Sequence, residues 1–374
     1  MPIVNFLIPA VVLLLAAGLD YVIGDPWGWP HPVRVMGWVI SHFTQFALKP
    51  GSDKDEGERD KFSNQSHIPL CRLKRRGAGI VLGIGLIVSS GLVGWLIVQG
   101  ASWINPLVGV VVQSVLLASC FAGRSLRVAA VDVLQPLTDR DLVQARSKLS
   151  QYVGRDTEKL SEAEILRAVL ETVTENATDG VTAPLFYAIA GAFLPGVGSV
   201  PLALAYKAAS TLDSMVGYRV EPYTDLGWFS AKLEDVLTWL PCRLTVITLA
   251  LLSGKPLAVW QLCLRDATRD SSPNSGWSEC AYAAILDVQL GGTNWYQGVA
   301  KEKPLLGNPL HPITPEKINQ ALRLTRYCFL IWLSLAIAFL GLSVNAKYLL
   351  IGLITAHLDA GQLAALGFPF LLNL

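Results

Sequence analysis

The sequence contains little charge for its length. Only 16% of its 374 residues are charged, whereas 52% are hydrophobic, and the mean hydropathy is +0.43. A soluble domain of ordinary composition carries more charge than this. The chain is therefore predicted to be a polytopic membrane protein.

Several kinds of functional site are missing as well. The six cysteines show no C-x-x-C spacing, which argues against a zinc knuckle and against a disulfide framework. The five histidines lack the i, i+4 pairing of a metal-binding helix, so a metal ion would have to be held by oxygen. No G-x-x-x-x-G-K-[ST] loop is present, and the net charge of +1 argues against nucleic acid as a partner.

Long apolar segments are what the sequence has in abundance. Four of them approach the roughly 20 residues that cross a bilayer as a helix, namely Phe6–Ile23, Ala78–Val98, Val108–Ala122 and Phe329–Val344. Three more are interrupted by proline, glycine or charge, namely Pro184–Tyr206, Val236–Ser253 and Tyr348–Leu372. Interrupted helices persist at membrane depth only where protein or a wet cavity surrounds them. We therefore predict an all-α fold: one integral membrane domain over residues 1–374, with about five to seven apolar helices, some broken or re-entrant.

The distribution of basic residues predicts the orientation of the chain. Basic residues are dense between Lys49 and Arg76, whereas the link Gln99–Pro106 carries no charge. Because basic residues favour cytoplasmic loops, the first loop is predicted to be cytoplasmic and the N-terminus to lie outside. Two polar segments, 124–183 and 254–326, are then expected on the cytoplasmic side as helical or loop structure. Residues 51–65, rich in Asp, Lys, Glu and Ser, are predicted to be a flexible insertion.

An acidic motif lies at the end of the first polar segment. Ser161 and Glu164 form a capping box that predicts the start of a helix. At 3.6 residues per turn this helix places Glu171 and Glu175 on one face with Thr178, and Asn176 and Asp179 on the adjacent face. The simpler interpretation is a solvated helix face. Because the cluster runs directly into an apolar segment, we instead predict oxygen ligands for Mg²⁺.

A second motif combines a lysine with hydroxyl groups. On a helix Lys207 shares a face with Thr211 and Ser214, whereas Asp213 points away from it. Such a lysine is suited to binding phosphate. A lysine that extends to the membrane interface is the structural alternative.

Two polar turns follow further along the chain. Pro273–Gly276 offers side-chain oxygens, although Ser275 could simply cap the next helix. Gln289–Tyr296 is interpreted as another polar turn that contains glycine. Two such turns on either side of a short helix could form the wall of a pocket.

The first apolar segment ends in a proline-rich loop, Gly24–Arg34. Its three prolines fix the backbone and would hold Asp25, His31 and Arg34 at the interface. His31 alone would be interpreted as a structural histidine. Together the three side chains indicate a functional site.

Five motifs follow one another along the chain, namely Gly24–Arg34, Val153–Thr157, Glu171–Tyr187, Tyr206–Tyr218 and Ser272–Trp277. Taken in this order they resemble the CobD/CbiB family of cobalamin biosynthesis, whose members are adenosylcobinamide-phosphate synthases. The resemblance runs from the first helix to about Gly307, and residues 51–65 depart from it.

The resemblance implies an ATP-dependent amide ligation in the cytoplasmic membrane, with the active site facing the cytoplasm. The free propionate of adenosylcobyric acid would be joined to (R)-1-amino-2-propanol or its O-phosphate, with Mg²⁺ and ATP required. The bilayer and other membrane enzymes of late cobalamin synthesis are the further partners it implies.

The resemblance implies three roles for the motif residues: metal binding, catalysis, and binding of substrate or phosphate. The metal ligands would be Glu175, Asp179 and Asp213, and the catalytic residues Glu171, Glu175, Asp25 and His31. Substrate or phosphate would be bound by Arg34, Asn176, Lys207, Thr211, Ser214, Tyr218, Arg219, Ser272, Asn274 and Ser275.

For these motifs to meet, an even number of membrane crossings must separate them. We therefore predict that Pro195–Gly198 is the tip of a re-entrant hairpin and that Val236–Ser253 does not cross simply. Two alternatives remain open. A transporter would use Asp20, Arg243 and Asp359 along a solute path, and a membrane phosphotransferase would also use Mg²⁺ and carboxylates at the membrane boundary.

Overall fold

A computed structural model describes the backbone of residues 2–25, 31–48, 67–218 and 220–357, and the side chains of residues 8–25, 31–48, 72–218 and 220–342. The predicted insertion 51–65, Arg219 and Asp359 lie outside the described residues. The helices are α1 (Pro2–Val22), α2 (Pro32–Ala47), α3 (His67–Ile104), α4 (Pro106–Ala118), α5 (Gly123–Thr138), α6 (Leu142–Leu149), α7 (Glu162–Asn176), α8 (Ala183–Ala192), α9 (Ser199–Val216), α10 (Tyr223–Leu226), α11 (Trp228–Leu252), α12 (Pro256–Asp266), α13 (Ser275–Leu286) and α14 (Pro315–His357). A π-helical turn (Ala177–Thr182), a 3₁₀ turn (Ala267–Arg269) and two strands, β1 (Leu290–Tyr296) and β2 (Val299–Leu306), complete the elements.

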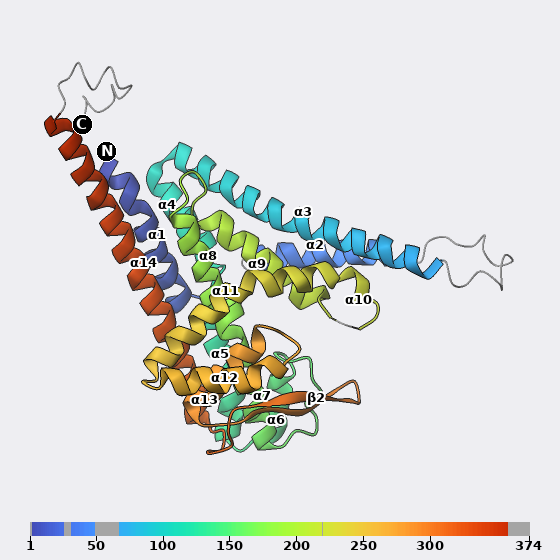
Figure 1. Ribbon diagram of the computed structural model, residues 1–374. Helices are drawn as coiled ribbons and strands as arrows, with labels where there is room; N and C mark the ends of the chain where they lie inside the picture. The colour runs from blue at the N-terminus through green and yellow to red at the C-terminus, as the bar shows by residue number, and fades with distance from the viewer. Residues whose placement is uncertain (1, 26–30, 49–66, 219, 358–374) are drawn as a thin grey trace.

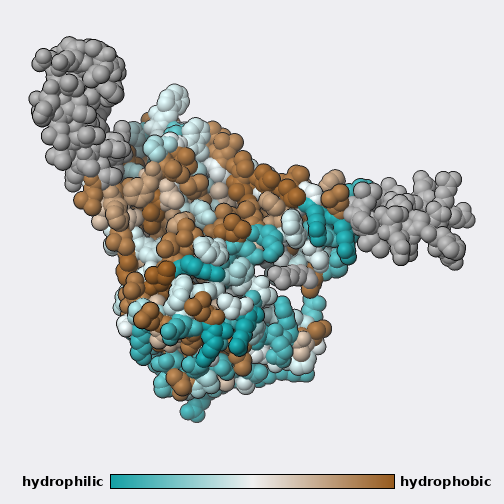
Figure 2. Space-filling view, viewed as in Figure 1, coloured by the Kyte–Doolittle hydropathy of each residue, from teal (hydrophilic) through white to brown (hydrophobic). Residues whose placement is uncertain are grey.

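The long helices α1, α3 and α14 lie in one half of the molecule, and α6, α7 and the hairpin of strands lie in the other (Figure 1). We call the first half the apolar part and the second the polar part, after their surfaces in Figure 2. Helices α1 and α14 run side by side in the apolar part, which also contains α3, α4, α8 and α9. Hydrophobic surface gathers over the apolar part, and hydrophilic surface over α6, α7 and the hairpin of strands (Figure 2). This division is compatible with a multi-pass membrane protein.

Four described stretches are long and apolar enough to cross a membrane: Arg72–Ile104, Pro106–Thr138, Trp228–Leu252 and Pro315–Leu342. A shorter apolar helix covers Ile8–Val22. The predicted span at 78–98 falls within Arg72–Ile104, and the one at 329–344 overlaps Pro315–Leu342 up to residue 342. The span predicted at Val108–Ala122 falls within Pro106–Thr138, in which α4 ends at Ala118 and α5 begins at Gly123.

Helices α8 and α9 form the predicted hairpin, with its tip at Pro195–Gly198. Gly196 and Gly198 adopt φ values of 81° and 88°, which favour glycine. The tip is attached to α3, because the indole N–H of Trp95 donates to the carbonyl of Gly196 at 2.8 Å. Helix α8 has ten residues, about 15 Å of rise, and is too short to cross a core about 30 Å thick.

Helix α11 is continuous through Pro241, so the expectation of a broken segment at Val236–Ser253 is wrong. A proline inside a helix leaves the carbonyl four residues earlier without its donor. Here the hydroxyl of Tyr187 donates to that carbonyl, Leu237 O, at 3.0 Å. The chain after α11 turns back, since Nδ2 of Asn274 donates to the carbonyl of Asp235 at 2.8 Å.

The polar part begins with the helix that the capping box predicts. The hydroxyl of Ser161 accepts from the amide of Glu164, and the Glu164 carboxylate accepts from the amide of Ser161 at 2.7 Å. Helix α7 therefore begins where the sequence indicates.

The hairpin β1–β2 is the one departure from an all-α fold in the described residues. Gln289–Tyr296, interpreted as a turn, is mostly strand β1, which pairs antiparallel with β2. The turn itself lies at Gln297 and Gly298, with φ values of 50° and 77°. Gly291 belongs to a bulge in β1, where a Cβ would come within 2.0 Å of the carbonyl oxygen of Pro304.

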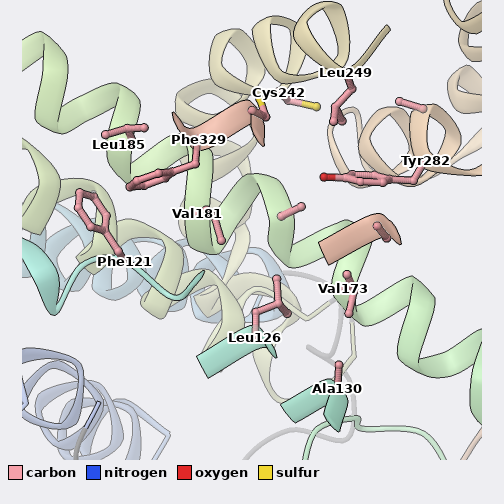
Figure 3. Close-up of a cluster of buried hydrophobic side chains, with 14 of the residues drawn as sticks. Phe121, Leu126, Ala130, Val173, Val181, Leu185, Cys242, Leu249, Tyr282 and Phe329 are labelled. Atoms are coloured by element: carbon pink, nitrogen blue, oxygen red, sulfur yellow. The ribbon is translucent and has the colours of Figure 1, made fainter. Parts of the chain in front are cut away.

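One hydrophobic core joins the two parts (Figure 3). It draws side chains from α5, α7, α8, α11, α13 and α14, and Phe121 meets Phe329 edge to face at 5.4 Å between ring centroids. This core fixes the relative positions of the helices that carry the polar motifs.

We expect Ser214, at the end of the hairpin, to lie on the same side of the membrane as α7. A single cysteine at exposed Ser214 should react with a membrane-impermeant maleimide from the same side as a cysteine at exposed Glu162. A cysteine at Ile104, between α3 and α4, should react from the opposite side. Cys71 should be replaced by serine, since the other five cysteines are buried. Labelling of position 214 together with position 104 would contradict the hairpin.

Candidate active site

Four of the predicted site residues line one cavity of about 630 Å³. Asp25 comes from the loop after α1, His31 and Arg34 from the start of α2, and Lys207 from the middle of α9. Residues from two separate motifs of the sequence are thus brought together. The prediction that all the motifs meet in one site is supported in this cavity for these two motifs only.

Asp25 and His31 form a pair in this cavity. Nε2 of His31 lies 2.9 Å from Oδ1 of Asp25, and the hydroxyl of Ser125 donates to Oδ2 at 2.6 Å. Burial raises the pKa of Asp25, but the hydrogen bonds from His31 and Ser125 outweigh burial and lower the pKa overall. Nδ1 of His31 accepts from the amide of Val33 at 3.3 Å and so caps α2.

The loop that carries Asp25 is fixed against the start of α5. The guanidinium of Arg124 donates to the carbonyls of Tyr21 and Val22 at the end of α1. Gly24 has a φ of 63°, and a Cβ there would lie 2.6 Å from Cδ of Arg124. The glycine therefore permits both the turn and the close approach.

Beyond Lys207 lies a group of carboxylates, here called the acidic cluster: Glu175, Asp179, Asp213, Glu234 and Asp235. Burial raises the pKa of Asp179 well above its usual value, and Glu234, Glu175 and Asp213 add to the shift, whereas Lys207 opposes it. Burial, Asp235 and Glu175 raise the pKa of Asp213 to about 6. Lys207 therefore lies between the Asp25–His31 cavity and the acidic cluster.

Lys207 itself lies in surroundings that disfavour its charge. Burial lowers its pKa, although Asp25 and Asp179 oppose the shift. No ion pair of Lys207 closer than 4.0 Å is found within the described part of the chain. An anion bound beside Lys207 would therefore favour the charged form of the lysine.

The predicted metal ligands are close in space but do not form a ready-made site. Among the described residues, no three His, Cys, Asp or Glu side chains are grouped so as to hold a metal ion. One observation suits a cation: Oδ1 of Asp213 is buried and has no hydrogen-bond partner. The carboxylates of the cluster are ligands of the kind that Mg²⁺ takes. The assignment of Glu175, Asp179 and Asp213 to Mg²⁺ stays a prediction.

Glu171 lies in different surroundings from Glu175. It is buried, its Oε2 lies 2.6 Å from the Arg155 guanidinium, and its Oε1 accepts from the amide of Gly291 at 2.9 Å. Glu175, one turn later, is exposed. The two residues are not equivalent members of one face, and the geometry favours Glu175 for chemistry.

The helix also departs from the predicted period after Asn176. Residues Ala177–Thr182 form a π-helical turn, in which the hydroxyl of Thr182 donates to the carbonyl of Ala177 five residues earlier, at 3.3 Å. Thr178 is buried and donates to Ser278 at 3.0 Å. The wider turn changes the direction of Asp179 relative to an α-helix.

Several predicted phosphate-binding groups donate to their own helix. The hydroxyl of Thr211 donates to Lys207 O at 2.7 Å, and that of Ser214 to Thr211 O at 2.9 Å. Tyr218 donates to Ser214 O, and Asn176 to Thr172 O. Their oxygens keep acceptor capacity, but the three hydroxyl donors and one of the two N–H donors of Asn176 are engaged. Their role toward phosphate stays a prediction.

The Ser-Pro-Asn-Ser-Gly turn lies beside the acidic cluster. Nδ2 of Asn274 donates to Asp235 O, while Oδ1 accepts from Arg243 at 3.0 Å. The hydroxyl of Ser272 accepts from the amides of Asn274 and Ser275 at 3.3 and 3.2 Å. The N-cap residue of α13 is Asn274, whose side chain makes no capping hydrogen bond, so the expectation that Ser275 caps the helix is wrong.

Lys303 is a candidate that the sequence did not indicate. Its ammonium group lies 2.6 Å from Oε1 of buried Glu279. Burial lowers the pKa of Lys303, but Glu279, Glu175 and Glu171 outweigh it and raise the pKa overall. The residue lies in strand β2, in the run Lys-Glu-Lys, where nothing in the sequence indicates that it faces Glu175.

Comparison with known proteins gives consistent matches. The model of a family described as CobD/Cbib protein matches residues 13–325. Cobalamin biosynthesis protein CobD of Synechocystis sp. is 54% identical over 87% of this chain and 90% of its own length. CobD of Halalkalibacterium halodurans is 39% identical over 88% and 97%, and CbiB of Salmonella typhi is 39% identical over 86% and 94%. No solved structure matches the chain.

The difference between Glu171 and Glu175 can be measured. Glu171→Gln should destabilise the protein by about 3 kcal/mol, because it leaves the partly buried Arg155 without its counter-charge. Glu175→Gln, at an exposed position, should change stability by less than about 0.5 kcal/mol. Chemical unfolding in detergent compares the two variants. Equal stability of both would contradict the structural role of Glu171.

Proposed function

The chain belongs to the CobD/Cbib family, and we propose that it is the ATP-dependent amide ligase that attaches an amino alcohol to a corrinoid acid. Its relatives carry the name of cobalamin biosynthesis proteins, so the chain takes part in cobalamin biosynthesis as an enzyme. The proposed substrates are adenosylcobyric acid and (R)-1-amino-2-propanol or its O-phosphate. The observation that carries the proposal is the position of Lys207, between the Asp25–His31 cavity and the acidic cluster.

The first step needs cations near phosphate. A carboxylate acylates poorly, so the terminal phosphoryl group of ATP would pass to the propionate oxygen, giving an acyl phosphate and ADP. Lys207 and Arg34 line the cavity and would hold phosphate oxygens. Mg²⁺, if held by Glu175, Asp179 and Asp213, would offset the charge of the phosphate groups.

The second step needs an acceptor for a proton. The amine nitrogen attacks the acyl carbonyl, phosphate leaves, and the nitrogen loses one proton as the amide forms. The Asp25–His31 pair lies in the same cavity as Lys207 and would take up that proton as a unit. Glu171 is less suited, because Arg155 and Gly291 already occupy its oxygens.

A transporter is less well supported. Asp20 and Arg243, which would line a solute path, have local partners instead. Asp20 accepts from the amide of Arg124 at 3.5 Å, and the Arg243 guanidinium lies 4.6 Å from the centroid of the Trp277 ring. Both contacts connect neighbouring elements of the fold.

Purified protein with ATP, Mg²⁺, adenosylcobyric acid and aminopropanol O-phosphate should yield an amide product and one ADP per amide. Mass spectrometry detects the corrinoid product, and a coupled assay measures ADP. Omission of Mg²⁺ should stop both. ADP formation without an amide in a folded sample, or movement of substrate across vesicles without chemistry, would overturn the proposal.

Lys207→Met should reduce turnover by about 10²–10³-fold, the loss seen when one group that stabilises transition-state charge is removed. Glu175→Gln should abolish turnover while the unfolding midpoint stays unchanged. Glu162→Gln, exposed in the first turn of α7, serves as the control and should retain full activity. Full activity of Lys207→Met would contradict the proposed role of Lys207 in binding phosphate.

A further inference from the structure

A second cavity, of about 780 Å³, lies between α1, α5 and α14. These helices are neighbours in the fold, and α1 and α14 run side by side (Figure 1). The cavity is largely apolar, with three arginines in its wall, Arg127, Arg323 and Arg326. None of the roles proposed above uses it.

Two of the three arginines lie over one aromatic ring. The guanidinium carbons of Arg326 and Arg127 lie 4.0 and 5.0 Å from the centroid of the Tyr21 ring. Within the described residues none of the three forms an ion pair closer than 4.0 Å. Asp20 and Glu316 also line the cavity, so the wall has three positive and two negative side chains. The ring therefore holds cations that are not paired to carboxylates.

Polarity changes along the cavity in one direction. On α14, Glu316 and Asn319 lie toward its beginning, Arg323 and Arg326 follow, and Leu330 and Leu333 lie deeper in the apolar stretch Pro315–Leu342. Seven residues separate Arg326 from Leu333, about 10 Å along the helix. Leu14 of α1 and Leu330 are 50% and 42% exposed, so apolar surface is open beside the arginines.

This order matches that of a phospholipid. The phosphate of a lipid lies at the boundary, its polar head outward and its acyl chains inward. A free anion would leave the apolar surface uncovered, and an apolar helix would leave the arginines without a counter-charge. We propose that this cavity binds an anionic phospholipid, its phosphate held by Arg127, Arg323 and Arg326 and its acyl chain lying against Leu14, Leu330 and Leu333.

Native mass spectrometry of the full-length protein, titrated with phosphatidylglycerol or with phosphatidylcholine of the same acyl chains, tests the proposal. Wild type should bind one phosphatidylglycerol more tightly than phosphatidylcholine. The double variant R323Q/R326Q should bind it about 30-fold more weakly, since each basic residue near an anionic surface contributes about fivefold. R72Q/R75Q, which removes two arginines from the polar end of α3, is the matched control and should bind like wild type.

A second variant blocks the cavity without removing charge. Gly18 lines it, and a Cβ built on Gly18 meets no atom within 4 Å. Gly18→Leu should therefore fold, be at least as thermally stable as wild type, and lose the tight phosphatidylglycerol. Equal affinity for the two lipids, retention of the lipid by Gly18→Leu, or its displacement by inorganic phosphate or by adenosylcobyric acid would each overturn the proposal.

Discussion

The structure depends on packing that holds the negatively charged carboxylates of the acidic cluster close to one another beside the apolar helices. Carboxylates of α7, the π-helical turn, α9 and α11 meet in the acidic cluster, where burial and mutual repulsion raise the pKa of Asp179. Such an arrangement separates unless packing elsewhere opposes it. The core around Phe121, Val181 and Phe329 joins the helices that carry these charges (Figure 3). Hydrophobic burial therefore offsets the electrostatic cost of the cluster.

Two neighbouring carboxylates, Glu171 and Glu279, are each paired with a basic side chain. Glu171 is enclosed by Arg155, Arg167 and the amide of Gly291, and Glu279 is paired with Lys303. These contacts attach the β hairpin to α7 and α13. The hairpin is thereby held to the helices mainly by polar contacts, since it contributes only Leu290 and Leu306 to the core.

Local sequence patterns predicted the helices and turns well. They did not predict contacts between residues that are distant in the sequence. The capping box at Ser161 and the glycines at 196 and 198 each specify backbone geometry through nearby atoms. The strand at 290–296 was missed because Gly291 and Gly292 are typical of turns, whereas here they form a bulge. The π-helical turn could not be predicted from the 3.6-residue spacing of apolar and polar residues, because that spacing is the period of an α-helix. Lys303 reaches Glu279 from 24 residues away, which no local pattern reports.

The hydroxyl of Tyr187 has a consequence for how the helices can move. It donates to Leu237 O, the carbonyl that Pro241 leaves without a donor in the helix. The Tyr187 ring stacks on that of Tyr206, with 4.9 Å between centroids, and the Tyr206 hydroxyl lies 2.8 Å from that of Thr238. Thr238 in turn donates to Glu234. This polar seam crosses α8, α9 and α11 where no water is available to replace a lost partner. These hydrogen bonds therefore oppose sliding of α11 along its axis by one helical turn. They keep Glu234 at a fixed position relative to Lys207.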